Sequence, residues 1–235
     1  MMGTNPNLAM VEVVANHLGR LKGRVVFLGG AATGLLLTDP AAAQIRPTKD
    51  VDVIVQVGSR MEYRALEKEL LELGFRQDRS EGAPLCRWVI EGVLVDVMPT
   101  DPALLGFSNR WYPEAMEEAM AFTLPGGTEI RLVSAPYFLV TKLEAFLGRG
   151  EEDFMASHDL EDVVTLIDGR PSVVEEVLGA NQDLRKYIAE TLNRFLQDDS
   201  FIGSIQGSLL PDRASQARFP LLLERFQAIS RLPQQ

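Results

Sequence analysis

One stretch decides the fold: Arg46-Pro47-Thr48-Lys49-Asp50-Val51-Asp52-Val53-Ile54-Val55. Residues two apart on a strand share a face, so the valines of this stretch are expected to pack into a core while Asp50 and Asp52 point together to the other side. Two neighbouring carboxylates repel each other, and a proton, a basic side chain or a metal ion must relieve that repulsion. Mg²⁺ prefers carboxylate oxygens, usually together with substrate phosphates. The alternative is a solvated strand face with both acids in water.

A third acid lies on a later strand. Asp96 interrupts the apolar run Val93-Leu94-Val95-Asp96-Val97-Met98, where an unpaired carboxylate would be costly. If this strand lies beside the strand of Asp50 in one sheet, all three acids can converge on one or two cations. The alternatives are a salt bridge between Asp96 and a nearby arginine, or a sheet edge that is open to water.

Length and composition limit the class of protein. The chain has 235 residues and a net charge of -10, which allows one large or two small domains and argues against a protein that coats nucleic acid nonspecifically. No apolar run reaches the length of a membrane span, and no secretion signal is evident. Cys86 is the only cysteine, which excludes an internal disulfide and a cysteine-rich zinc site. The expected compartment is the cytoplasm.

Hydrophobic periodicity predicts strands in the first part of the chain and helices in the last. The expected strands are residues 25–28, 51–57, 85–90, 93–98, 121–124 and 129–133, with a hairpin at Glu91-Gly92. The expected helices are residues 7–20, 31–37, 61–73, 136–147, 155–168, 171–179, 182–197 and 216–230. This order indicates an α+β fold, with one lobe over residues 1–134 and an all-helical C-terminal lobe over residues 135–235.

Two charged residues of the helical part stand out. Lys142 falls on the apolar side of its helix, so it either snorkels to water or points into a cleft and meets an anion. Asp159 borders the apolar stripe of the next helix, with Asp162 one turn further on. Ser157 is a candidate N-cap, which would put Asp159 in the first turn, where the helix dipole favours acids. That capping role is as reasonable for Asp159 as a functional one.

Together these residues resemble the nucleotidyltransferase superfamily, which has the DNA polymerase β-like fold. The closer resemblance is to the AbiEii-like nucleotidyltransferases, which include toxins of type IV toxin–antitoxin systems. The matching features are Gly29-Gly30 at a strand-to-helix turn, Thr48-x-Asp50-x-Asp52, Asp96 on a later strand, Lys142 on a helix and Asp159-x-x-Asp162 on the next. His158 stands where those proteins have a basic Arg or Lys. The resemblance covers about residues 25–168 and implies a mixed sheet with helices, followed by helices that complete a nucleotide cleft.

The resemblance implies metal-dependent transfer of an NMP from an NTP to an acceptor hydroxyl. Asp50 and Asp52 would hold the Mg²⁺ that binds the triphosphate, and Asp96 would bridge to a second Mg²⁺ near the acceptor. Asp159 would orient Lys142 or the nucleotide. The residues expected to bind the nucleotide are Gly29, Gly30, Thr48 and Lys142.

The acceptor stays open between a tRNA 3′ end, a protein hydroxyl and a small molecule. RNA is favoured because the resemblance points to toxins and because the tail from Asp183 onward, with seven basic and six acidic residues, is the least acidic part of the chain. A cognate antitoxin is a partner that the resemblance allows, and no membrane partner is expected.

Two rival interpretations remain. A dinucleotide-binding fold would use Gly29 to Gly34 and the acid about 20 residues later, but the spacing is not G-x-G-x-x-G and Asp50 begins a strand instead of ending one. The other rival is a non-catalytic module that uses the nucleotidyltransferase fold to bind a partner.

Overall fold

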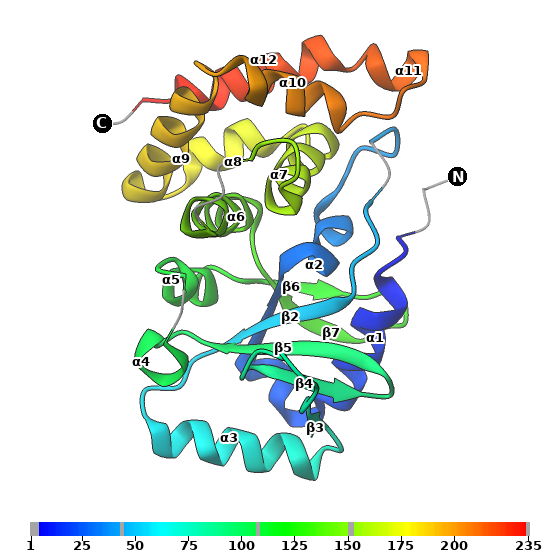
Figure 1. Ribbon diagram of the computed structural model, residues 1–235, viewed down its shortest axis with the longest axis vertical. Helices are drawn as coiled ribbons and strands as arrows, with labels where there is room; N and C mark the ends of the chain where they lie inside the picture. The colour runs from blue at the N-terminus through cyan, green and yellow to red at the C-terminus, as the bar shows by residue number, and fades with distance from the viewer. Residues whose placement is uncertain (1–4, 43–44, 107–108, 150–152, 234–235) are drawn as a thin grey trace. The chain divides into compact units, whose positions relative to one another are not determined.

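The chain forms two compact units. The computed structural model describes residues 5–42, 45–106, 109–149 and 153–233. The sheet unit comprises residues 5–34 and 47–134, and the helical unit comprises the described residues of 35–46 and 135–235. Both units are labelled by element in Figure 1. The predicted α+β class is confirmed, with the strands in one unit and a helical C-terminal region.

The sheet unit is built on one mixed seven-stranded sheet in the order β3-β4-β5-β2-β1-β7-β6. The strands are β1 (Val25–Leu28), β2 (Asp50–Val55), β3 (Arg76–Gln77), β4 (Arg87–Ile90), β5 (Val93–Pro99), β6 (Met120–Thr123) and β7 (Glu129–Leu132). β2 pairs in parallel with β5 and β1 in parallel with β7, and the other neighbours are antiparallel. The parallel β2–β5 pair brings the strand of Asp50 beside the strand of Asp96, as the sequence predicted.

Strand alternation divides the sheet into an apolar and a charged face. Val51, Val95 and Trp88 lie side by side on β2, β5 and β4 and are almost completely buried. Burial of such side chains removes a large apolar area from water, which stabilises the sheet. Residues one position away on each strand therefore point to the opposite face, and they include Asp50, Asp52, Asp96 and Arg87.

Short helices surround the sheet within the same unit. They are α1 (Leu8–His17), η1 (Gly19–Arg24), α3 (Arg60–Glu72), α4 (Pro102–Leu105) and α5 (Tyr112–Glu117). α1 packs against β2, β4 and β5 through Val11, Val14 and Ala15. α3 begins at Ser59, whose hydroxyl accepts a hydrogen bond from the Glu62 N–H, a standard N-cap. α2 (Gly29–Leu36) starts in the sheet unit and ends in the helical unit.

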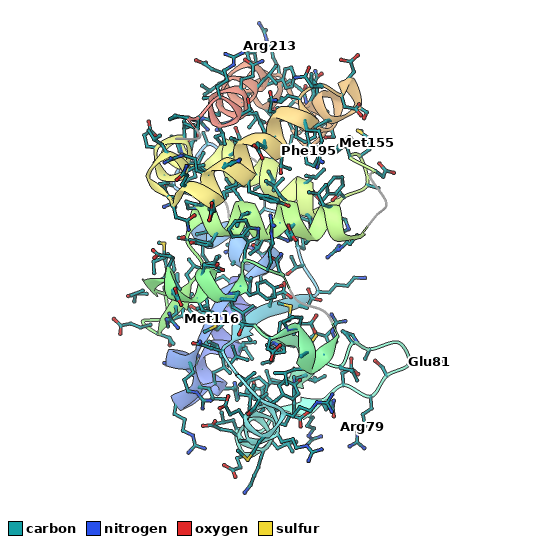
Figure 2. The ribbon with its side chains drawn as sticks, turned by 90° about the vertical axis from the view of Figure 1, so that its left-hand side faces the viewer. Arg79, Glu81, Met116, Met155, Phe195 and Arg213 are labelled. Carbon is teal, nitrogen blue, oxygen red and sulfur yellow. The ribbon has the colours of Figure 1, made fainter. Side chains whose placement is uncertain are left out.

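The helical unit is held by stacked helices and an aromatic cluster. Its helices are α6 (Ala135–Arg149), α7 (His158–Gly169), α8 (Val173–Gly179), α9 (Gln182–Phe195), α10 (Asp199–Gly207), α11 (Arg213–Gln216) and α12 (Phe219–Ser230). Ring centroids of neighbouring members of the cluster lie 5.1–5.7 Å apart, and its members are Phe146, Phe154, Phe195, Phe201 and Phe226. Figure 2 labels Phe195 among the helices of this unit. Such aromatic pairs add to the stability that burial alone gives.

The described residues of 35–46 belong to the helical unit and not to the sheet unit. The N–H groups of Thr38 and Asp39 both donate to the carbonyl of Gly169 at the end of α7. Arg218 donates to the buried Asp168 at 2.8 and 3.1 Å and to Asp39 at 2.7 Å. A single guanidinium thus ties α12, α7 and this early segment together, and it neutralises a carboxylate that would be costly to bury alone.

The differences from the predicted elements are mostly at their ends. The helix predicted over residues 31–37 begins two residues earlier at Gly29. The helix predicted over residues 216–230 begins at Phe219 as α12, and Gln216 instead ends the short α11. α4, α5, α10 and β3 were not predicted, because they are short or carry no clear periodicity. The predicted hairpin at Glu91-Gly92 is confirmed, and both residues have positive φ. Among the described residues, no helix is both long and apolar enough to span a bilayer.

Gly169 tests the docking of residues 35–46 onto α7. A Cβ at this position would lie 2.8 Å from the Leu37 side chain and 2.9 Å from the Ala42 Cβ. We expect Gly169→Ala to lower the free energy of unfolding by about 1–3 kcal/mol, the usual cost of overpacking. Gly148→Ala in α6 is the matched control, because a Cβ there meets nothing within 4 Å. Equal denaturant midpoints for the two variants would contradict this packing.

The lone cysteine gives a test of the sheet core. Burial, and to a smaller extent the nearby Asp96 carboxylate, raise the pKa of the Cys86 thiol to about 12. Because the thiolate is the reactive form, we expect the folded protein to resist thiol–disulfide exchange at pH 8 and the unfolded protein to react quickly. Thiol titration with a chromogenic disulfide, with and without denaturant, measures this. Rapid labelling of the folded protein would show that Cys86 is accessible.

Candidate functional site

The strand register brings the predicted acids to one face of the sheet. Asp52 on β2 pairs with Leu28 on β1 and with Asp96 on β5, and Asp96 pairs with Arg87 on β4. The four residues form one row across four strands. Asp50 lies two residues before Asp52 on the same strand and therefore on the same face. The expectation that Asp50, Asp52 and Asp96 share a face agrees with this register.

Arg87 is the residue that the sequence analysis did not single out. Its Nε donates to Asp96 Oδ1 at 2.8 Å and its Nη2 donates to Asp96 Oδ2 at 2.7 Å. The same Nη2 donates to Asp50 Oδ2 at 2.7 Å. Bidentate charge-assisted bonds of this kind are the strongest hydrogen bonds in proteins, and the bond to Asp96 in particular raises the pKa of Arg87 above its ordinary value.

The pairing of Arg87 with Asp96 could have been predicted from the sequence. A tight hairpin at Glu91-Gly92 pairs Ile90 with Val93, and counting outward pairs Arg87 with Asp96. The salt bridge between Asp96 and a nearby arginine, one of the alternatives weighed for this acid, is what the structure contains.

The resemblance implies Mg²⁺ at these acids, and their geometry suits it in part. Asp50 and Asp52 offer carboxylate oxygens on one face, which suits one hard cation. Among the residues that the structure describes, however, no group of three or more Asp, Glu, His or Cys side chains is arranged to hold a metal ion. Both oxygens of Asp96 accept bonds from Arg87. The three acids do not form a two-ion site while Arg87 keeps this arrangement.

Gly29 allows Asp52 to approach the turn between β1 and α2. Gly29 has φ of +71°, and a Cβ built on it would lie 1.9 Å from Asp52 Oδ2. Any larger residue would collide with the carboxylate, and an L-residue would also be strained at this φ. The carboxylate thus lies against the first residue of α2, the end of a helix that favours negative charge. Gly30, the second predicted glycine, is buried within the first turn of α2.

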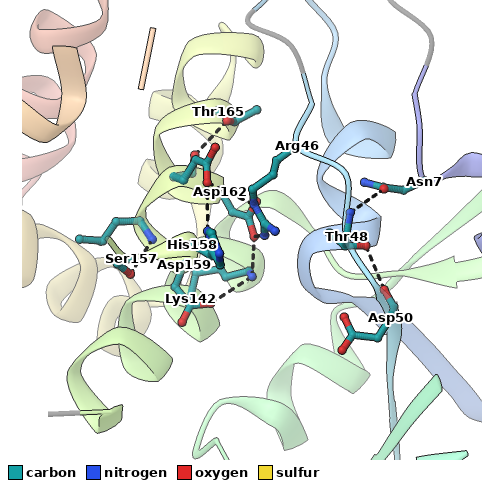
Figure 3. A network of polar contacts seen from close by, with 12 residues as sticks. Asn7, Arg46, Thr48, Asp50, Lys142, Ser157, His158, Asp159, Asp162 and Thr165 are labelled. Carbon is teal, nitrogen blue, oxygen red and sulfur yellow. Dashed lines mark hydrogen bonds and ion pairs between the residues drawn. The ribbon is translucent and has the colours of Figure 1, made fainter. Parts of the chain in front are cut away.

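Thr48 is engaged with the backbone at the entry to β2. Its N–H donates to Asn7 Oδ1 at 2.9 Å, and its hydroxyl donates to the Asp50 carbonyl at 3.0 Å (Figure 3). Asn7 is completely buried. The Thr-x-Asp pattern therefore positions the start of β2, and with it the Asp50 side chain.

Lys142 and Asp159 meet in the helical unit. Lys142 Nζ lies 3.1 Å from Asp159 Oδ1 and 2.6 Å from Asp162 Oδ2 (Figure 3). The lysine, predicted to either snorkel or meet an anion, meets two carboxylates and is only 12% exposed. Ser157 caps α7 by accepting from the Leu160 N–H, so Asp159 both lies in a capped first turn and binds Lys142.

Two arginines complete this cluster and were not predicted. Arg46 Nε lies 3.2 Å from Glu161 Oε2 and its Nη2 lies 3.4 Å from Asp162 Oδ2. Arg149 Nη1 lies 3.2 Å from Asp159 Oδ2. The cluster collects three cations around three acids, so its charges nearly cancel. Sequence spacing could not reveal Arg46, because it lies more than 100 residues from its partners.

Comparison with solved structures supports the fold. No protein-family model matches the chain, and no curated protein matches it. The chain is similar to the crystal structure of an antigenic nucleotidyltransferase-like protein from Paracoccidioides brasiliensis, with a TM-score of 0.51 and 21% sequence identity. The match covers 91% of this chain and 98% of that chain. This likeness extends over both units and indicates a nucleotidyltransferase-like fold.

Proposed function

We propose that this protein is a metal-dependent nucleotidyltransferase, which moves an NMP from an NTP to an acceptor hydroxyl. The observation that carries the proposal is the row of acids beside the Gly29 turn, in a sheet whose fold resembles a nucleotidyltransferase-like protein. A fold alone does not imply an activity. The side chains that this row presents must therefore supply the chemistry.

In this proposal, the glycine turn binds phosphate oxygens and the acids bind the metal ion. Gly29 and Gly30 let backbone N–H groups at the start of α2 approach phosphate oxygens. Asp50 and Asp52 would hold a Mg²⁺ ion, which supplies charge neutralisation on the triphosphate and on the leaving pyrophosphate. Thr48 supports this site by fixing the backbone of Asp50.

The remaining acid acts at the acceptor. Asp96 would orient the acceptor hydroxyl, and its carboxylate would accept the proton that the hydroxyl loses. The hydroxyl oxygen then forms a bond to the α-phosphorus while the bond to the bridging oxygen of pyrophosphate breaks. For such transfers, positioning and electrostatics supply most of the rate enhancement.

Lys142 and Asp159 act together in this proposal. The Lys142 ammonium would neutralise negative charge on the nucleotide phosphates. Asp159 orients that ammonium, in keeping with their 3.1 Å contact. His158, next to Asp159, lies on the exposed side of α7.

RNA, and a tRNA 3′ end in particular, is the acceptor class that we favour over a protein or a small molecule. The tail from Asp183 onward is the least acidic part of a chain whose net charge is -10, so binding should be weak and steeply dependent on salt. A toxin role with a cognate antitoxin follows from the resemblance to the AbiEii-like proteins. We assign the activity to the cytoplasm, where a free thiol such as Cys86 stays reduced.

A non-catalytic module is the second candidate, and one observation favours it. Arg87 forms ion pairs with both Asp50 and Asp96, and such pairs also occur as purely structural contacts. A module of this kind would bind a partner and release no pyrophosphate.

The first functional prediction concerns Asp50. We expect Asp50→Ala to lower transfer to below about one hundredth of wild type, the scale on which loss of one electrostatic group lowers turnover. The assay incubates the protein with labelled NTPs, Mg²⁺ and total tRNA or cell extract, and follows label and pyrophosphate. EDTA should abolish transfer, and added Mg²⁺ should restore it.

Glu129→Gln is the control for this assay, because Glu129 is an exposed acid on β7 of the same sheet. An Asp50→Ala protein as active as this control would mean that the site is wrong. Label on protein alone would mean that the acceptor is a protein and not RNA, and the nucleotidyl transfer reaction would still be supported. No label on any acceptor, with no NTP binding, would favour the non-catalytic module.

The second functional prediction concerns Lys142. Lys142→Ala leaves the buried Asp159 and Asp162 without their ammonium, so we expect a loss of about 3 kcal/mol in the free energy of unfolding. Lys142→Arg keeps a cation, so it should retain stability and raise the KM for NTP, because a guanidinium presents its charge differently.

Lys186→Ala, at an exposed position of α9, controls for loss of a lysine elsewhere in the helical unit. Denaturant titration and steady-state kinetics separate the two roles of Lys142. An unchanged KM in Lys142→Arg would leave Lys142 with a structural role only.

A further inference from the structure

The charged face of the sheet carries a basic side chain beside the acids, the guanidinium of Arg87. Arg87 lies on a four-residue strand whose other face is anchored by the buried Trp88 and Ile90. The strand continues into a tight hairpin at Glu91-Gly92. The Arg87 side chain therefore points to the face that carries the acids, directly opposite Asp96. The position of the guanidinium is a consequence of strand pairing, not of a mobile loop.

The guanidinium uses the oxygens that a metal ion would need. Three N–H···O contacts of 2.7–2.8 Å occupy both oxygens of Asp96 and one oxygen of Asp50. A divalent cation at Asp96 would lie within a few ångströms of a fixed positive charge, and the two would repel each other. Arginine stays protonated at any physiological pH, so a change in pH does not remove it.

We propose that Arg87 takes the place of a second divalent cation at Asp96, so that this protein loads one divalent ion fewer than its three acids suggest. The inference rests on the proposed function, because it concerns the same acids. The ion at Asp50 and Asp52 remains, because Arg87 contacts one oxygen of Asp50, whereas it contacts both oxygens of Asp96. Arg87 is thus a positioning residue that holds Asp96 and limits the metal content of the site.

In the part of the chain that the structure describes, the acids do not form a three-ligand group, and Arg87 bridges two of them. Two carboxylates share one guanidinium, which leaves less negative charge for a cation than three separate acids would. Removal of Arg87 should restore that charge. The site should then gain an ion, provided that Asp96 is still present to bind it.

The test counts bound Mn²⁺, a spectroscopic substitute for Mg²⁺, in the full-length protein. Wild type, Arg87→Gln and the double variant Arg87→Gln/Asp96→Asn are titrated by calorimetry and by electron paramagnetic resonance, with a non-hydrolysable NTP analogue present. We expect Arg87→Gln to bind one more Mn²⁺ per chain than wild type, and the double variant to lose that extra ion. Arg76→Gln controls for the change in net charge, because Arg76 is an exposed arginine on β3 of the same sheet.

Thermal unfolding gives a second readout that does not depend on catalysis. In EDTA, Arg87→Gln should unfold at a lower temperature than wild type, because Asp50 and Asp96 lose their shared partner. Mn²⁺ should raise the melting temperature of Arg87→Gln by more than that of wild type. In EDTA, the melting temperature of the double variant should fall less than that of Arg87→Gln. The neutral amide that replaces the Asp96 carboxylate needs no positive partner.

The outcomes separate this proposal from the proposed function. Equal Mn²⁺ stoichiometry in wild type and Arg87→Gln would overturn the role of Arg87, while transfer activity of the wild type would still support a nucleotidyltransferase. One extra ion in Arg87→Gln that the double variant loses would support the role of Arg87, even if no acceptor were labelled. Binding of no Mn²⁺ by any variant would overturn both.

Discussion

The register of β4, β5 and β2 is the constraint on which the charged site depends. It sets Arg87 beside Asp96 and Asp96 beside Asp52. A slip of one residue would carry these side chains to the opposite face of the sheet. Such a slip would also expose Val51, Val95 and Trp88, which are buried at 0–2% exposure. Packing on the apolar face therefore fixes the arrangement of charges on the other.

Charge compensation follows the same rule in both units. Asp96 is paired with Arg87 in the sheet unit, and Asp162 is paired with Lys142 and Arg46 in the helical unit. Asp168, which is 1% exposed, is paired with Arg218. A carboxylate taken out of water without a partner is strongly destabilising. In a chain with a net charge of -10, several basic residues thus form ion pairs with buried acids.

This compensation has a consequence for the chemistry. The acids that resemble a metal site and the lysine that resembles a phosphate ligand are both already engaged with side chains. In the proposed function, a nucleotide or metal ion would have to compete with those side chains, and the cost of separating them would reduce its affinity. The likeness to a nucleotidyltransferase-like protein concerns the fold. The side chains around Asp96 and Lys142 decide how this chain uses that fold.

Local patterns in the sequence determined much of the architecture. Valines at alternate positions set the two faces of β2 and of β5, and Glu91-Gly92 set the hairpin. They also indicated the capped start of α7 at Ser157. These features depend on periods of two or 3.6 residues and on caps, which a short window of sequence contains.

Only the tertiary structure decided which charges meet. The docking of residues 35–46 onto α7, the partners of Arg46 and the bond from Arg87 to Asp50 all join residues far apart in the chain. Arg87 could be paired with Asp96 by counting through the hairpin, but its reach to Asp50 depends on the parallel pairing of β2 with β5. Ion pairs of this kind form because burial makes an unpaired charge costly, and burial is a property of the folded chain that no local pattern encodes.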